Sequence, residues 1–442
     1  MEQKVTLKQD LGLISGLALV VGTVIGSGVF FKQASVLQTT GNQTLGLLAW
    51  TLGGVITLAA GLTVAEIGSR IPDAGSGGFY SYIEKIYGHF WGFMTGWSQV
   101  IVYAPAVIAS IGGYAAHLTA NFLGIDMVWA RYIGIFYIIF IAGLNLLENR
   151  IAAVFAVTTT IIKMIPIVGL MIYGIFFGHA NALGQTMTQV TSTTSGSFGM
   201  AILATLFAYD GWVLVANIRG EMRRPKRDLP LSIILGVTLV LVAYVGVTFG
   251  VYRTLPSATI ISLKDNAVFA IIQSAFGTFG GRLLSVIIII SMLGTMNGKM
   301  VAFPRMAYMM AQNGLFPKYL ARLNRRTFVP SNATLSLSGL TILLTLFTNS
   351  ADRISDMAMF TIWLFYVAAF IGLFVLRYRQ RDQERQIDFK VPLFPVTPLI
   401  GVFGGLFVVV STIQSDFSGT IVSILMVAVG IPVYYYFTHH NQ

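Results

Sequence analysis

Runs of about twenty mostly apolar residues recur along the chain, separated by short polar segments. A helix needs about 20 apolar residues to cross the hydrocarbon core of a bilayer. The alternation with a period of two that marks the strands of a β-barrel is absent from these runs. The pattern therefore predicts an all-α integral membrane protein with twelve spans, near residues 11–38, 44–66, 91–121, 130–147, 151–178, 198–217, 230–253, 281–312, 331–348, 357–378, 396–413 and 418–438.

Two shorter amphipathic segments lie between spans, at residues 77–85 and 266–277. Both are too short to cross a bilayer. An amphipathic segment of this length is typical of a helix at the membrane surface. The sequence predicts a short helix at each position, and the first could instead be a re-entrant gate.

The first apolar run is interrupted at residues 22–28, where glycines and hydroxyl residues replace the expected large apolar ones. Glycine lowers the cost of leaving helical geometry, and a break inside a membrane must face protein, water or a ligand. The amides opening the second half-helix would attract a carboxylate, and they belong to Gly26, Ser27 and Gly28. The carbonyls closing the first half-helix suit an ammonium, and they belong to Thr23, Val24 and Ile25. The alternative is a small-residue packing face between helices.

A second interruption is predicted in the sixth span, where Asp210 and Gly211 stand near its centre. A carboxylate at that depth is costly unless it is paired or hydrated. Two broken helices, five spans apart and at matching depth, indicate an inverted-repeat transporter. The predicted organisation is one transmembrane domain over residues 1–442, with repeats 11–178 and 198–378 and appended helices at 396–438. A single kinked helix with a structural aspartate would explain the sixth span alone.

Lys163 lies in the middle of the fifth span, where an ammonium must be held by carbonyls, hydroxyls or a carboxylate. We expect it to tie this span to the first interruption and to the eighth span, where Ser291 and Thr295 supply polar groups. Two alternatives are a proton-carrying lysine and a lysine that reaches the membrane surface. Lys299 and Arg305, further along the eighth span, are expected to contact lipid phosphates or loop carboxylates.

Composition and charge narrow the class of protein. The 442-residue chain is 55% hydrophobic and 10% charged, against about 25% charged in soluble domains. The net charge of +11 comes mostly from alternate loops, including residues 4–8, 219–227, 318–326 and 377–390. This asymmetry predicts cytoplasmic termini and argues against nucleic-acid binding. The chain has no cysteine, and its five histidines fall at span ends or the terminus, so we expect no metal, no cofactor and no disulfide-linked subunit.

Three motifs stand out in the sequence: residues 22–30, Ala65-Glu66-Ile67-Gly68 followed by Pro72 and Gly77-Gly78, and residues 207–212. Together they resemble the amino acid–polyamine–organocation superfamily and, within it, the L-amino acid transporter family, closest to its bacterial serine/threonine exchangers. The resemblance covers nearly the whole chain. It implies a LeuT-like fold with unwound helices one and six and two appended helices. It further implies sodium-independent exchange of small neutral L-amino acids across the cell membrane, within its lipids and without a partner subunit.

The resemblance also implies roles for individual residues. The substrate carboxylate would bind the amides of Gly26, Ser27 and Gly28, and the ammonium would meet the carbonyls of Val24, Phe207 and Asp210. The Phe207 ring would close over the substrate, Lys163 matches a lysine of sodium-independent members, and Tyr244 would reach the same region. Thr23, Ser291 and Thr295 would support the site. Many eukaryotic members carry glycine at the position of Asp210. The resemblance therefore implies no role for the Asp210 side chain.

Other functions remain open at this stage. A proton-coupled amino acid symporter, with Lys163 or Asp210 as the protonated group, is the main alternative to an exchanger. Interrupted helices favour a closed site at the midplane over a channel pore. An intramembrane enzyme is disfavoured because the spans contain no histidine cluster, no cysteine and no pair of carboxylates.

Overall fold

The computed structural model describes residues 9–72, 74, 77–147, 149–178, 198–347, 351–382, 387–415 and 417–440. The apolar runs in these ranges form helices, and the described residues contain no strand, only one isolated bridge between Leu11 and Met222. Lys4, Lys8 and Arg385, which contributed to the predicted topology, lie outside the described residues, as does residue 348 at the end of the predicted ninth span.

The first half of the chain folds into α1 (Leu13–Val24), α2 (Gly28–Phe31), α3 (Gln33–Thr40), α4 (Gln43–Arg70), α5 (Phe79–Tyr87), α6 (His89–Trp97), the π-helix η2 (Ser98–Tyr103), α7 (Ala104–Leu123), the 3₁₀ turn η3 (Met127–Trp129), α8 (Ala130–Leu146) and α9 (Asn149–Phe177). The second half folds into α10 (Phe198–Ala208), the 3₁₀ helix η4 (Trp212–Glu221), α11 (Pro225–Thr254), α12 (Ser257–Leu263), η5 (Lys264–Asn266), α13 (Ala267–Gln312), η6 (Lys318–Ala321), α14 (Ser331–Phe347), α15 (Ala351–Arg379), α16 (Val396–Ser415), α17 (Phe417–Ala428) and α18 (Gly430–His440).

Eleven helical stretches among the described residues are long and apolar enough to cross a membrane. The predicted ninth span corresponds to α14, an apolar helix of 17 residues that is slightly shorter than the others. An all-helical membrane fold is therefore confirmed, whereas the count of twelve spans stays a prediction.

Both short amphipathic segments are helical. The first forms α5, most of whose residues are buried against the bundle. The second forms the beginning of α13, which turns sharply at Gly277 before the long span continues. Gly277 has φ +68°, a left-handed conformation that glycine adopts without the cost a side chain would incur.

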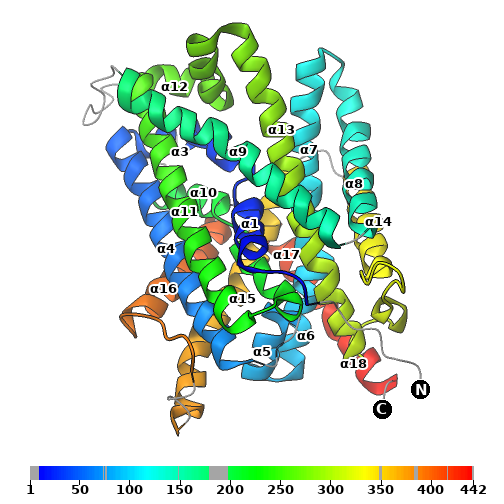
Figure 1. The fold of residues 1–442 in the computed structure, drawn as a ribbon. Helices are drawn as coiled ribbons and strands as arrows, with labels where there is room; N and C mark the ends of the chain where they lie inside the picture. The colour runs from blue at the N-terminus through cyan, green and yellow to red at the C-terminus, as the bar shows by residue number, and fades with distance from the viewer. Residues whose placement is uncertain are drawn as a thin grey trace.

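Helix α1 lies in the middle of the bundle, with α4 and α11 on one side and α7, α8 and α14 on the other (Figure 1). It packs against α9, α11, α13 and η4, and eight of its twelve residues are buried. Large apolar side chains on α8, α9 and α16 are instead exposed, as expected for helix faces in contact with lipid. The break in α1 is therefore surrounded by protein.

A buried carboxylate joins three segments at one end of the bundle. Glu66 of α4 is fully buried and accepts hydrogen bonds from Arg70 (2.6 Å), from two nitrogens of Arg377 on α15 (2.9 and 2.7 Å) and from the amide of Val391 (2.7 Å). Buried charges are tolerated when they are paired in this way. The cluster holds the segment before α16 against α4 and α15.

We predict that Glu66→Gln destabilises the fold, because it removes the charge that compensates two guanidinium groups. Breaking a buried ion pair from one side costs about 3–5 kcal/mol, which should lower the apparent Tm of the detergent-purified protein by several degrees. The control is Asp382→Asn, which removes a carboxylate that is 92% exposed and 4.0 Å from Arg381. Equal Tm values for Glu66→Gln and Asp382→Asn would contradict a stabilising role for the Glu66 cluster.

Candidate functional site

The break in the first span follows Val24, where α1 ends. Ile25 leaves helical geometry with ψ 90°, and the amide of Gly26 turns back to the carbonyl of Val24 at 2.8 Å. Helix α2 then begins at Gly28. The amides of Ser27 and Gly28 donate to no acceptor among the described residues, so they are available to an anion at this point.

The break in the sixth span comprises Tyr209, Asp210 and Gly211, between the end of α10 and the start of η4. Gly211 has φ +114°, a conformation that residues with a Cβ rarely adopt. A Cβ on Gly211 would also lie 2.9 Å from the carbonyl oxygen of Thr23. Glycine is therefore required here both for the turn and for the close approach of the first break.

The two breaks contact each other directly. The Thr23 hydroxyl donates to the carbonyl of Gly211 at 3.0 Å, and Gly28 packs against Ala208. Tyr244 of α11 is fully buried, and its hydroxyl lies 3.0 Å from the carbonyl of Val24 and 3.1 Å from that of Ala208. One hydroxyl thus reaches the carbonyl ends of both half-helices.

Lys163 of α9 also supports the first break. Its ammonium is fully buried and donates to the carbonyls of Gly22 (3.0 Å) and Ile25 (2.5 Å), with Ser291 O and Thr295 Oγ1 at 3.3 and 3.4 Å. Both α13 residues also donate to the break themselves, because the hydroxyls of Ser291 and Thr295 lie 3.3 and 3.1 Å from the carbonyl of Ile25. Lys163 therefore joins α1, α9 and α13, as the sequence analysis expected.

A small cavity of about 40 Å³ lies between the breaks. It is lined from α1, α2, α7, α10, α13 and α15, and its polar lining includes Ser27, Gly28, Ser110, Asp210 and Lys299. A buried water needs about 10–15 Å³ of such volume, so the cavity in this conformation matches a few waters. Its walls must move outward to admit a larger molecule.

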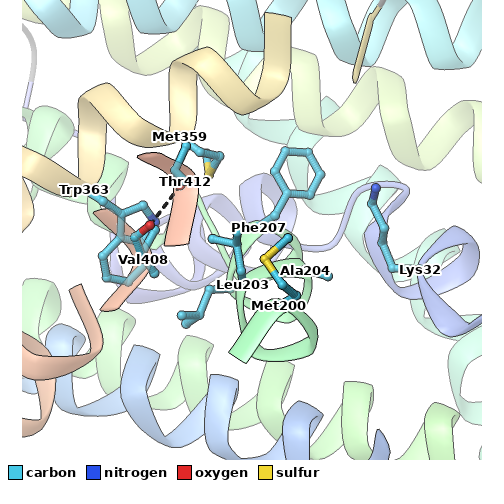
Figure 2. Close-up of a pocket in the computed structure, with 10 residues that line it drawn as sticks. Lys32, Met200, Leu203, Ala204, Phe207, Met359, Trp363, Val408 and Thr412 are labelled. Atoms are coloured by element: carbon cyan, nitrogen blue, oxygen red, sulfur yellow. Dashed lines mark hydrogen bonds between the residues drawn. The ribbon is translucent and has the colours of Figure 1, made fainter. Parts of the chain in front are cut away.

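The Phe207 ring separates this cavity from two larger ones. A cavity of about 330 Å³ on the side of α3 and α7 shares Ser27, Gly28 and Phe207 with it. Another, of about 230 Å³, is shown in Figure 2, where Phe207 lies between Met359 and Lys32. The Lys32 ammonium is 5.6 Å from the centre of the Phe207 ring, within the range of a cation–π contact. The half-buried ring thus stands where the three cavities meet.

The side chain of Asp210 points into a cluster of charged and phenolic groups. Its carboxylate accepts a hydrogen bond from Tyr103 of η2, and Tyr366 of α15 lies 3.5 Å away. Lys299 of α13 is 2% exposed, with its ammonium 3.6 Å from Asp210 and 3.3 Å from the Tyr103 hydroxyl.

The expectation that Lys299 contacts lipid phosphates or loop carboxylates is therefore wrong. The part of α13 that carries Lys299 faces the bundle, and the ammonium compensates the intramembrane carboxylate of Asp210. Arg305, six residues further along, pairs with the buried carboxylate of Glu221, the last residue of η4.

The structure brings all the predicted site residues together around the two breaks. Three members of the Asp210 cluster, Tyr103, Lys299 and Tyr366, were not predicted from the sequence. The cost of a carboxylate inside a membrane does indicate a partner cation, and Lys299 is a lysine in another span. Tyr103 could not be placed because a π-helix shifts the register of the third span. The described residues bring together no group of three histidine, aspartate or glutamate side chains that could hold a metal.

The model of the amino acid permease family matches residues 11–434. The chain belongs to the amino acid permease family. The permease is 39% identical to the serine/threonine exchanger SteT of Bacillus subtilis over 97% of each chain. It is 28% identical to the human cystine/glutamate transporter, over 99% of this chain and 86% of that one. It is also 28% identical to the mouse b(0,+)-type amino acid transporter 1, over 99% and 89%.

The resemblance found in the sequence motifs is thereby confirmed. The permease is a multi-pass membrane protein of the amino acid transporter and exchanger class, and its relatives are not enzymes. The two contacting breaks are the features to test first.

We predict that Gly28→Ala abolishes most transport. The new Cβ would lie 2.6 Å from the Cβ of Ala208, so the two breaks would have to separate. A cost of about 1.4 kcal/mol in the transport barrier is tenfold in rate, and we expect a loss of at least that size in uptake by proteoliposomes. Gly143→Ala on α8, where a Cβ meets nothing within 4 Å, is the control. Wild-type uptake by Gly28→Ala would show that the breaks need no close contact.

We predict that Lys163→Met lowers both transport and stability. The change keeps the apolar stem but removes the donor to the carbonyls of Gly22 and Ile25. The Thr295 hydroxyl stays within hydrogen-bond distance of both carbonyls, so the loss is that of hydrogen bonds to a charged donor, about 1.5–3 kcal/mol each. Uptake should fall about tenfold or more, and the Tm in detergent should fall with it. Unchanged values of both would mean that Ser291 and Thr295 hold the break without the ammonium.

Proposed function

We propose that the permease is a sodium-independent antiporter that exchanges small neutral L-amino acids such as alanine, serine or threonine by alternating access. The printed name of the Bacillus subtilis relative, at 39% identity, supports serine/threonine exchange. The more distant human relative is named for cystine and glutamate. The amino acid class is thus common to these relatives, whereas the side chain they accept differs.

The observation that carries the proposal is the contact between two breaks of complementary polarity. The amides of Ser27 and Gly28 are available for the α-carboxylate at the start of α2. The carbonyls of Val24, Phe207 and Asp210 would receive the α-ammonium. A carbonyl oxygen has two lone pairs, and that of Phe207 accepts a further donor beside the Asp210 amide. The Val24 carbonyl already accepts from the Gly26 amide and the Tyr244 hydroxyl, so it would release one of these donors when the ammonium binds. The groups recognised in this way are shared by all α-amino acids.

The walls of the cavity favour a small side chain. Ala208, Ser110 and Thr295 are small residues on three different helices that face it. The cavity is about 40 Å³ in this closed conformation, so a bulky side chain would require a larger outward movement of Phe207 and α7. The hydroxyl of serine or threonine would find polar partners at Ser110 and in the Asp210 cluster.

Sodium independence is supported by the position of Lys163. Hard cations such as sodium are bound by carbonyl and hydroxyl oxygens in protein sites. The Lys163 ammonium lies among the oxygens of Gly22, Ile25, Ser291 and Thr295, so a fixed positive charge takes the place that a mobile cation would need.

The proposed transport cycle follows from the repeat organisation. The repeats 11–178 and 198–378 would be related by inversion, with the appended helices at 396–438 outside the cycle. Hinging at the two breaks would expose the site alternately to each side of the cell membrane, with both termini in the cytoplasm. No disulfide-linked subunit is needed, since the chain contains no cysteine.

A proton-coupled symporter is the second candidate, favoured by buried titratable groups at the breaks. The described partners of Lys163 are all neutral oxygens, and Asp210 is paired with Lys299 beside the cavity. Protonation of Asp210, or deprotonation of Lys163, would change the contacts of one break.

The deciding experiment is uptake of radiolabelled alanine or serine into proteoliposomes. We expect uptake to require unlabelled amino acid inside the vesicles. We also expect the uptake rate to be independent of sodium and of a pH gradient. Gly28→Ala in the same vesicles is the negative control for uptake through the site. Uptake into empty vesicles that is driven by the pH gradient would instead establish the symporter.

A further inference from the structure

A second cavity, of about 550 Å³, lies away from the amino acid site, where the segment before α1 meets the first turns of α9 and the segment 222–224. Its polar lining includes Ser15, Thr158 and the guanidinium-bearing Arg150 and Arg223. Leu11 forms two backbone hydrogen bonds with the neighbouring segment. Its amide donates to the carbonyl of Glu221 (3.0 Å), and its carbonyl accepts from the amide of Arg223 (2.8 Å). These hydrogen bonds fix the segment around Leu11, which lines the crevice.

The charges of this crevice are unbalanced. Arg150 and Arg223 are exposed, and neither forms an ion pair with a described residue. Asp10 is the carboxylate in the lining, so the three charged side chains leave a net charge of one positive unit. The two guanidinium groups match a phosphate, whose oxygens accept several hydrogen bonds, whereas Thr158 lies two turns further along α9.

The crevice opens onto the lipid-facing side of α9. Exposed residues recur along this helix with helical spacing, at Ile151, Val154, Thr158, Ile161, Ile165, Val168, Ile172 and Ile175. From Val154 to Ile175 the stripe covers about 32 Å at about 1.5 Å per residue, which equals the thickness of the hydrocarbon core of about 30 Å. Arg150 lies one turn before Val154, at the depth where lipid phosphates lie.

We propose that this crevice binds one anionic phospholipid, with its phosphate between Arg150 and Arg223 and an acyl chain along the exposed stripe of α9. Basic pockets between membrane helices are typical sites for anionic lipid headgroups. The single net positive charge matches the single negative charge of phosphatidylglycerol. The lining also has an apolar part, formed by Ala153, Val154 and Val157. A free phosphate ion has no apolar group to pack against these side chains, whereas a phospholipid does.

The position of the crevice connects the lipid to the transport site. Helix α1 begins at Leu13, beside the crevice, and ends at the first break. Helix α9 carries both Arg150 and Lys163, so the same two helices meet at the lipid and at the break. The bound lipid holds the start of α1 against α9.

The test measures lipid bound to the delipidated, detergent-purified protein by native mass spectrometry. Wild type should retain one phosphatidylglycerol per chain, while phosphatidylcholine binds less. Each basic residue near a membrane surface contributes attraction to anionic lipid, so Arg150→Gln with Arg223→Gln should reduce phosphatidylglycerol occupancy about tenfold or more. The matched control is Arg322→Gln with Arg326→Gln, which removes the same charge from an exposed loop.

Two further variants and one competitor complete the design. Ala153→Trp fills the crevice but keeps both arginines, and it should also lose the lipid. Arg150→Lys with Arg223→Lys keeps the charge and should retain most of the binding. Equal phosphatidylglycerol occupancy in the glutamine variant and wild type would overturn the proposal, as would an equal loss in the Arg322 and Arg326 control. Displacement of the lipid by millimolar inorganic phosphate would assign the site to free phosphate.

Discussion

Two helices of this permease stop halfway along their path through an apolar bundle, and the polar backbone groups that they expose must be satisfied without bulk water. The carbonyls of the first break are held by the Lys163 ammonium and by the hydroxyls of Ser291 and Thr295. Tyr244 reaches one carbonyl of each break. Because these donors come from α9, α11 and α13, the packing of three other helices depends on the geometry of the breaks. Among the described residues the amides of Ser27 and Gly28 have no acceptor, and in the proposed exchanger the substrate carboxylate would bind them.

Three buried carboxylates of the bundle are paired with cations. Asp210 is compensated by Lys299, Glu221 by Arg305 and Glu66 by two arginines. The second and third of these pairs, with Arg219 donating to the carbonyls of Gly68 and Ile71, hold η4 and α4 in place beyond the break. A movement that separated η4 from α13, or α4 from α15, would also separate these charges, so the contacts oppose it.

The local features that define the candidate site were visible in the sequence because each is an anomaly in a membrane-spanning run. Glycine and a carboxylate at mid-span predicted the breaks, and an isolated lysine predicted a ligand cage of carbonyls and hydroxyls. The partner of Asp210 was not predictable in the same way. Lys299 and Asp210 are separated by about half of the predicted repeat 198–378, and the helix face that Lys299 presents to its neighbours depends on the tilt and rotation of α13. The spacing of residues along the sequence does not give the tilt or rotation of a helix.

The sequence by itself determined that the chain is a helical membrane protein, where its helices run and at which residues two of them are interrupted. These properties are local, because apolar length and backbone freedom act on neighbouring residues. The tertiary structure alone decided that Gly211 touches Thr23, that Tyr244 joins both breaks, and that Arg150 and Arg223 meet at one crevice. Those contacts join residues far apart in the chain, and they exist only once helix tilt and rotation are set by packing.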